Sequence, residues 1–232
     1  MKVNILKVIF SVIFFIITVS PGQGIFLDDF NDGTLDGWTP SGATAWTNPG
    51  TYAYNSISLN VVLGDTGTYI SSLDQPYTGP SNFWSFDFYR THAAAGVYVY
   101  ETWSTAKNYL EKNSTNDLYL LMDDYERYIC CSDYHSLSMV GAGTSGTIEY
   151  SENTWYTVTV ERLTTTYSIK MYDSTTGNLV GSLSVGIGTQ IINPNSIGLS
   201  CTARVVGAAG YTITTTSTCA FDNIYASFVV GV

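Results

Sequence analysis

Short segments in which apolar and polar residues alternate recur along most of the chain, and this period of two constrains the fold more than any other feature. Such alternation places successive side chains on opposite faces of a β-strand. The segments are rich in aromatic and β-branched residues and are separated by Gly, Asn, Asp and Thr, which favours strands joined by turns. We expect strands at residues 83–91, 96–102, 117–122, 155–162, 167–172 and 179–185.

The same pattern indicates an all-β fold in one domain. The only helix candidate, residues 105–112, is too short and too polar to define the architecture. Many short antiparallel strands in a chain of this length form a sandwich or a barrel. With no interdomain linker and no repeat in the sequence, we expect a single β-sandwich domain at residues 25–232.

The start of the chain has the pattern of a secretion signal. Lys2 and Lys7 precede an apolar run at residues 8–19, and small residues follow at 20–24. A retained membrane anchor is the alternative, but this run is shorter than the roughly twenty residues needed to cross a bilayer. We therefore predict a signal peptide at residues 1–24, cleaved after Gly22 or Gly24. The mature protein would be secreted or held at the cell surface, without a membrane span.

Cleavage would leave seven basic and nineteen acidic residues, a net charge of −12. Binding to nucleic acid depends on clustered Lys and Arg that replace phosphate counterions, whereas the basic residues here are scattered. The charge therefore excludes a nucleic-acid partner. It leaves carboxylates that could hold a divalent cation.

The four cysteines form an even set in an exported chain, which favours disulfides. Cys201 and Cys219 flank a predicted hairpin made of residues 202–206 and 211–216, so their pairing is the favoured one. Cys130 and Cys131 would then form a bridge between neighbours in sequence. Alternatively, each of them pairs with one of the later cysteines. No spacing of cysteines and histidines is typical of a zinc site.

Two segments near the ends of the mature chain, and a third in its centre, carry a family resemblance. They are Asp-Asp-Phe-Asn-Asp-Gly with Leu-Asp-Gly-Trp at residues 28–38, Ala-Phe-Asp-Asn-Ile-Tyr at 220–225, and Asn-Thr-Trp-Tyr with two strands at 153–180. Together they resemble the concanavalin A-like lectin/glucanase and laminin G superfamily. The resemblance implies a two-sheet antiparallel jelly-roll sandwich, whose first and last strands lie side by side and each bury an aromatic residue. It does not define function, because the superfamily holds lectins, glycoside hydrolases, lyases and adhesive modules.

Alternation also selects candidate ligand-binding residues. In residues 83–91 the even positions are apolar apart from Arg90 and should face the core, which leaves the odd positions outside. Aromatic rings stack on the apolar face of a sugar while carboxylates accept hydrogen bonds from its hydroxyls. The alternative is that cross-strand tyrosines only stabilise the sheet. The candidate residues for binding a glycan are Asp87, Tyr89, Tyr98, Tyr100 and Tyr119.

Carboxylates near the two ends suggest a metal site. If the first and last strands are neighbours, Asp28, Asp29 and Asp222 could converge and offer the oxygen ligands that calcium prefers. The resemblance implies the same, because related sandwiches often hold a structural calcium where the termini meet. The alternative is that Asp222 and Asn223 only bond the backbone of the first strand or cap a turn.

The sequence lacks the pattern of a glycosidase active site. Retaining glycosidases of this superfamily carry a Glu-x-Asp-x-x-Glu pattern, which is absent here. Glu149 and Glu152 would face opposite ways on a strand, and Glu161 has no carboxylate partner nearby. Arg90 and His92 are a weak signal for a lyase. We therefore expect a secreted, non-catalytic carbohydrate-binding or adhesive module. The alternatives are a polysaccharide-degrading enzyme and a structural surface protein.

Overall fold

The computed structural model describes residues 26–62, 66–78, 81–95, 101–127, 134–143, 146–188, 195–206 and 212–227. Within these ranges every regular element is a β-strand, so the all-β prediction is confirmed. None of the described residues belongs to a helix long and apolar enough to span a membrane. The signal peptide predicted at residues 1–24 lies outside the described part. The strands are β1 (Phe26–Asp28), β2 (Thr39–Gly42), β3 (Ala53–Val62), β4 (Thr66–Pro76), β5 (Phe83–Ala95), β6 (Glu101–Lys112), β7 (Asp117–Arg127), β8 (Tyr134–Val140), β9 (Ile148–Glu149), β10 (Trp155–Arg162), β11 (Thr166–Asp173), β12 (Leu179–Gly186), β13 (Ser196–Val206) and β14 (Thr212–Ser227).

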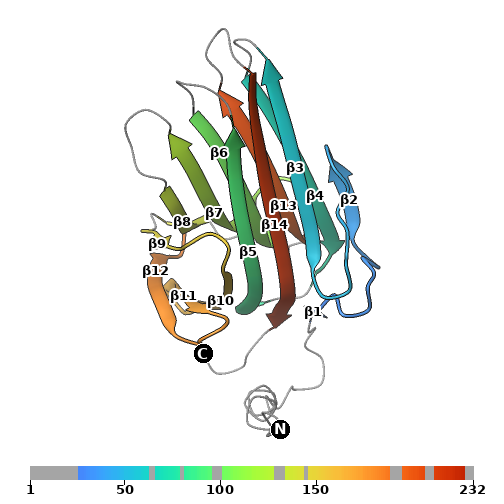
Figure 1. Ribbon diagram of the computed structural model, residues 1–232. Coiled ribbons are helices and arrows are strands. Elements are labelled where there is room, and N and C mark those ends of the chain that lie inside the picture. The colour runs from blue at the N-terminus through green and yellow to red at the C-terminus, as the bar shows by residue number, and fades with distance from the viewer. Residues whose placement is uncertain are drawn as a thin grey trace, which may run out of the picture.

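The strands form two antiparallel sheets that pack face to face (Figure 1). One, which we name the terminal sheet, has the order β1-β14-β5-β10-β11-β12, and β3 also pairs with β14. The other, the second sheet, has the order β2-β4-β13-β6-β7-β8-β9. This arrangement confirms the two-sheet antiparallel sandwich. The helix candidate at residues 105–112 lies in strand β6.

The structure agrees with several strands expected from alternation. Strand β10 spans the predicted residues, and β11 and β12 begin or end within one residue of the expected bounds. The turn between β11 and β12 is closed by Asp173, whose carboxylate accepts hydrogen bonds from the backbone N–H groups of Thr175 and Thr176 at 2.9 and 2.8 Å. Gly177 completes it with a φ of 72°, which glycine adopts without strain. Of the strand expected at residues 96–102, positions 96–100 lie outside the described residues.

The core forms where the two sheets meet. The even-numbered positions of β5 point inward, and Trp84, Phe86, Phe88 and Arg90 are almost fully buried. The second sheet supplies a matching apolar layer that includes Leu118, Leu120 and Met122 of β7. Burying each large apolar side chain contributes about 1.5–3 kcal/mol. The faces predicted for β5 and β7 are therefore confirmed.

The first and last described strands lie side by side. Strand β1 pairs antiparallel with β14, with Phe26 opposite Ala226 and Asp28 opposite Ile224. Phe30, just after β1, and Phe221, in β14, are both fully buried. The pairing and the two buried aromatic residues agree with the arrangement that the terminal segments predicted.

A disulfide joins Cys201 of β13 to Cys219 of β14, as predicted. The hairpin on which that prediction was based is wrong, because β13 pairs with β4 and β6 in the second sheet while β14 pairs in the terminal sheet. Successive strands here cross from one sheet to the other, and the disulfide therefore passes through the core between the sheets. Cys130 and Cys131 lie outside the described residues.

Two polar contacts also connect the sheets. Arg162 of β10 donates to the carboxylate of Glu111 in β6 at 2.7 Å, and its guanidinium lies 5.0 Å from the ring centre of Trp84. Burial raises the pKa of Glu111, and the positive charge of Arg162 opposes that shift. Arg90 of β5 donates to the backbone carbonyl of Met122 in β7. Together with the disulfide, these contacts fix how the sheets sit against each other.

Candidate functional site

The structure separates the residues predicted to bind a glycan. Asp87 and Tyr89 point outward from β5 in the terminal sheet, as expected from alternation. Tyr119 also points outward, but from β7 in the second sheet, so the whole sandwich lies between it and the other two. Tyr98 and Tyr100 lie outside the described residues. Of the three candidates that the structure describes, Tyr119 therefore does not share a face with the other two, and Asp87 and Tyr89 define the face to consider.

Four aromatic side chains lie together on that outer face. The rings of Tyr89 and Trp155 are 5.6 Å apart between centres, Tyr52 is 5.6 Å from Trp155, and Tyr54 is 6.2 Å from Tyr52. All four are half-buried, so part of each ring remains accessible. Ala220 of β14 pairs with both Tyr54 and Tyr89 and is almost fully buried between them. We name Tyr52, Tyr54, Tyr89 and Trp155 the aromatic row.

Polar side chains lie one step further along the same strands. Asp87 of β5 is the register partner of Asp222 in β14 and of Thr157 in β10. The side-chain amide of Asn223 donates to Asp87 Oδ2 at 2.8 Å and to Asp222 Oδ2 at 3.3 Å, and so joins the two carboxylates. We name Asp87, Thr157, Asp222 and Asn223 the polar row. Together the two rows place carboxylates and an amide beside a group of tilted, neighbouring rings.

An unusual backbone conformation positions Asn223. The register of β14 against β5 shifts between Asp222 and Tyr225, which marks a β-bulge, and Asn223 has a φ of 51°. Asn153, with a φ of 58°, accepts a hydrogen bond from the Tyr89 hydroxyl at 3.1 Å. Residues other than glycine seldom adopt such left-handed angles, and Asn tolerates them better than most. Bulges and strained residues are often found where a protein aims side chains at a ligand.

The two carboxylates of the polar row disfavour each other's charge. Burial raises the pKa of Asp222 to about 6, and the nearby negative charges of Asp87, Asp29 and Asp28 add to the shift, while the Asn223 backbone N–H opposes it. Burial likewise raises the pKa of Asp87, against hydrogen bonds from Thr157 and Asn223. In the described part of the chain, neither carboxylate forms an ion pair with Lys or Arg. The face therefore carries negative charge that no basic residue there balances.

The aspartates near β1 make hydrogen bonds within the chain. Asp28 accepts from the Phe30 backbone N–H at 2.9 Å and from the Trp38 indole N–H at 2.6 Å, and Asp29 accepts from the Asn31 backbone N–H at 3.2 Å. Asp28 thus anchors Trp38 and the turn that follows β1. Over the described ranges, no group of three or more His, Cys, Asp or Glu residues is arranged to hold a metal ion. Calcium binding by Asp28, Asp29 and Asp222 stays a prediction.

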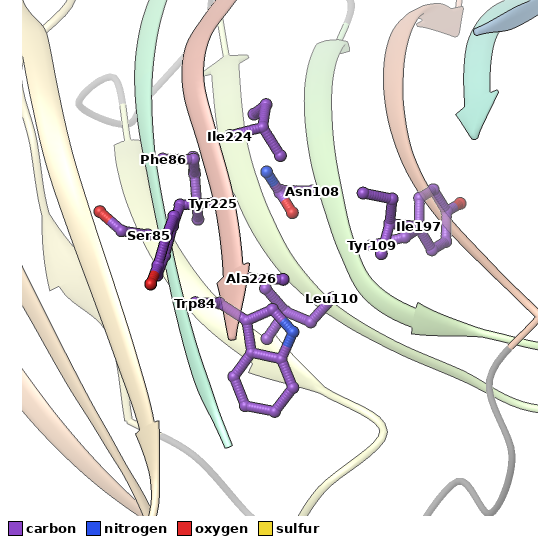
Figure 2. A pocket seen from close by; sticks show the side chains of 10 residues that line it. All are labelled: Trp84, Ser85, Phe86, Asn108, Tyr109, Leu110, Ile197, Ile224, Tyr225 and Ala226. Atoms are coloured by element: carbon purple, nitrogen blue, oxygen red, sulfur yellow. The ribbon is translucent and has the colours of Figure 1, made fainter. Parts of the chain in front are cut away.

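A small pocket lies away from this face, between the two sheets (Figure 2). Its empty volume is about 210 Å³, part of which is open solvent. The side-chain N–H groups of Asn108 and Trp84, which line it, have no hydrogen-bond partner in the protein. The pocket is thus suited to solvent rather than to a sugar. Its lining is Trp84, Ser85, Phe86, Asn108, Tyr109, Leu110, Ile197, Ile224, Tyr225 and Ala226.

The tyrosines on the outer face of the second sheet are covered by lysines. Tyr109 and Tyr119 lie 5.2 Å apart between ring centres, the ammonium of Lys107 is 4.6 Å from the Tyr119 ring, and Lys112 is 5.0 Å from Tyr109. Burial raises the pKa of Tyr109 to about 12. Lys112 also pairs with Asp74 at 2.9 Å. These cation–π contacts give the Tyr119 ring a stabilising role within the second sheet.

The residues considered for catalysis do not gather at one place. Glu149 is exposed on β9 of the second sheet, whereas Glu161 lies on β10 of the terminal sheet. Arg90 is only 1% exposed and bonds a backbone carbonyl, so it belongs to the core. His92 lies in β5, and its side chain is outside the described part. Glu152 lies in the loop before β10.

No family model matches the chain, and no curated protein is similar to it at a significant level. Several solved structures are similar in overall shape. Lectin II from Ulex europaeus has a TM-score of 0.47 at 12% identity, over 88% of this chain and 98% of that one. A peanut lectin with a bound 9-mer peptide has a TM-score of 0.48 at 10% identity, over 85% of this chain and 97% of that one. The exoplasmic/lumenal domain of VIP36 in its Ca²⁺- and Man2-bound form has a TM-score of 0.44 at 10% identity, over 86% of this chain and 89% of that one.

Proposed function

We propose that the protein is a secreted, non-catalytic carbohydrate-binding module whose ligand lies over the aromatic row of the terminal sheet. The observation that supports the proposal best is the combination of four neighbouring rings with two carboxylates and an amide on one exposed face. The rings present apolar surface to the C–H groups of a pyranose. Asp87, Asp222 and Asn223 can fix its hydroxyl groups by hydrogen bonds.

The strands that carry these side chains make the face rigid. Tyr89 and Trp155 are register partners on β5 and β10, in the middle of the terminal sheet. A ligand would therefore meet rings that are already in place, which lowers the entropy lost on binding. Because buried aromatic anchors dominate binding energies, removing the Trp155 ring should weaken binding by at least about tenfold, or about 1.4 kcal/mol.

The test is a screen of the mature protein against a glycan array, followed by titration calorimetry on the best ligand. We expect Tyr89→Ala and Trp155→Ala to reduce affinity, and Tyr119→Ala, on the second sheet, to leave it unchanged. Tyr119 is a matched control because it is also a half-buried tyrosine in a ring pair. A loss of binding in Tyr119→Ala alone would place the site on the other sheet, and no binding to any glycan would refute the proposal.

A hydrolase is the second candidate, and one observation favours it. The Asn223 amide nitrogen contacts Oδ2 of both Asp87 and Asp222, at 2.8 and 3.3 Å, so the two oxygens are no further apart than the sum of these distances. Retaining glycosidases hold their two carboxylates about 5–5.5 Å apart, with the acid/base residue at a raised pKa. Asp222 would be the acid/base and Asp87 the nucleophile. Release of reducing ends from a bound polysaccharide, abolished in Asp87→Asn, would favour the enzyme over the binding module.

A structural surface protein is the third class. Among the described residues, the exposed large apolar side chains are Tyr69 and Ile70 on β4 and Leu179 and Val180 on β12. These are two separate pairs on different sheets, whereas a protein-binding surface usually presents one broad apolar patch. This distribution favours glycan binding over a purely structural role.

Secretion and calcium are part of the proposal. The buried disulfide supports an oxidising compartment, and the pattern of residues 1–24 supports export. Expression with the natural leader should yield a mature protein in the medium that begins after Gly22 or Gly24. A structural calcium held by Asp28, Asp29 and Asp222 should raise the unfolding temperature when calcium is added and lower it with chelator. An unchanged temperature would exclude calcium.

A further inference from the structure

We propose that the face formed by the aromatic and polar rows selects sugars that carry a free, protonated amine, such as glucosamine units, over neutral and N-acetylated sugars. The inference rests on the proposed carbohydrate-binding function and names its ligand class. It is carried by the juxtaposition of two carboxylates that lack a basic partner in the described residues with a row of accessible rings.

The two carboxylates of the polar row favour a positively charged ligand. Asp87 and Asp222 are register partners on adjacent strands, where like charges directly opposite each other are unfavourable. Both are half-buried, and the amide of Asn223 satisfies only part of their capacity to accept hydrogen bonds, since each carboxylate has about four lone-pair sites. A neutral sugar would leave this repulsion in place. An ammonium group would balance the charge and donate three hydrogen bonds.

The aromatic row favours an ammonium group attached to a sugar ring. An ammonium within about 6 Å of a ring centre is attracted by the negative face of the ring, most strongly by Trp and Tyr. Tyr89 lies two residues from Asp87 in the same strand, and its ring is 5.6 Å from that of Trp155, so the rings and the carboxylates are neighbours. Calcium takes oxygen ligands, so it would use the carboxylates and not the rings. Rings beside carboxylates therefore fit an amino sugar, whose ring stacks while its amine meets the acids.

The charges around the site agree with a cationic ligand. Asp28 and Asp29 lie close enough to influence Asp222 electrostatically, and Lys170 on β11 is exposed two strands away from Asp87, one row further along. Lys107 and Lys112 lie on the other sheet. The carboxylates around the polar row thus give this part of the face a negative field, which attracts cations and repels uronates.

The decisive experiment compares two oligosaccharides that differ only in N-acetylation. Fully deacetylated and fully N-acetylated hexamers of β-1,4-linked glucosamine are titrated into the mature protein at pH 6.5, in chelator, by calorimetry. We expect the deacetylated hexamer to bind at least about tenfold more tightly. Asp87→Asn and Asp222→Asn keep the shape of the site and should abolish this preference, with folding checked by circular dichroism.

A charge-matched control separates recognition from general attraction. Glu149→Gln removes one negative charge from the second sheet, where the residue is exposed. It should leave the preference intact. A preference reduced equally by Glu149→Gln and Asp87→Asn would overturn the inference, since any acidic protein attracts a polycation. Equal or tighter binding of the acetylated hexamer would overturn it while leaving carbohydrate binding intact. Failure of both hexamers to bind would also overturn it, and only a blank glycan array would refute the function itself.

Discussion

The disulfide between the sheets leads to a quantitative prediction about stability. Cys201 and Cys219 are 18 residues apart in sequence and both are fully buried. In the chain-entropy model, closing a loop of that length stabilises the folded state by about 3 kcal/mol. We therefore expect the free energy of unfolding of the variant Cys201→Ala/Cys219→Ala to be about 3 kcal/mol lower than that of the unchanged protein. For a domain of this size, that corresponds to a fall of roughly 6–12 °C in Tm.

The single variants test the reasoning behind this number. If the cross-link is what stabilises, Cys201→Ala alone already removes it, and the second substitution adds only a small packing loss. The three variants should therefore be strongly non-additive in urea unfolding monitored by tryptophan fluorescence. Additive costs in the two single variants would mean that packing of the sulfur atoms, not the cross-link between sheets, provides the stability.

Three further predictions concern the Arg162–Glu111 pair, the Asp222 carboxylate and the backbone at Gly42. Arg162→Met leaves the buried carboxylate of Glu111 without its partner and should cost about 3 kcal/mol in urea unfolding, part of which is recovered by adding Glu111→Gln. Because the folded-state pKa of Asp222 is raised from 3.8 to about 6, the folded protein binds this proton more tightly, so stability should fall as pH rises from about 4 to 6. Asp222→Asn should flatten that slope, and an unchanged slope would contradict the assignment. Gly42→Ala should lower Tm more than Gly50→Ala, because both have φ above 100° but only at Gly42 would a Cβ meet a backbone carbonyl, 2.1 Å away; equal shifts would contradict the clash.

Alternation in the sequence predicted local structure well. It identified the inward positions of β5, including the buried Arg90, and the limits of β10. These succeed because the side chains of a strand alternate whatever its neighbours are. The pairing of β1 with β14 was also predicted, from the segments at the two ends.

Which sheet a strand joins could not be predicted in the same way. Tyr119 was grouped with Asp87 because both point outward. Residues that point outward from the two different sheets lie on opposite sides of the sandwich. The hairpin predicted before Cys219 failed for the same reason, since the chain crosses between sheets there. Partners distant in sequence decide sheet membership, and a single sequence does not display them.

The same limitation explains the residues missed at the candidate site. Tyr52 and Tyr54 precede Trp155 by about a hundred residues, and only the folding of β3 and β10 into one sheet brings them together. Asn223 was considered from the sequence only as a residue that bonds the first strand or caps a turn. Its role as a bridge to Asp87 depends on the bulge and its left-handed φ, which alternation does not reveal.

The place of β14 in the terminal sheet also affects how the protein must be made. This strand pairs with β1, β3 and β5, and so completes a sheet whose other members at its side all come from the first hundred residues. A ribosome would release those strands long before their common partner emerges. The early strands must therefore remain without this partner, with unpaired edges, until β14 has been synthesised. Sheets that depend on such distant pairings fold slowly, and their unpaired edges favour aggregation.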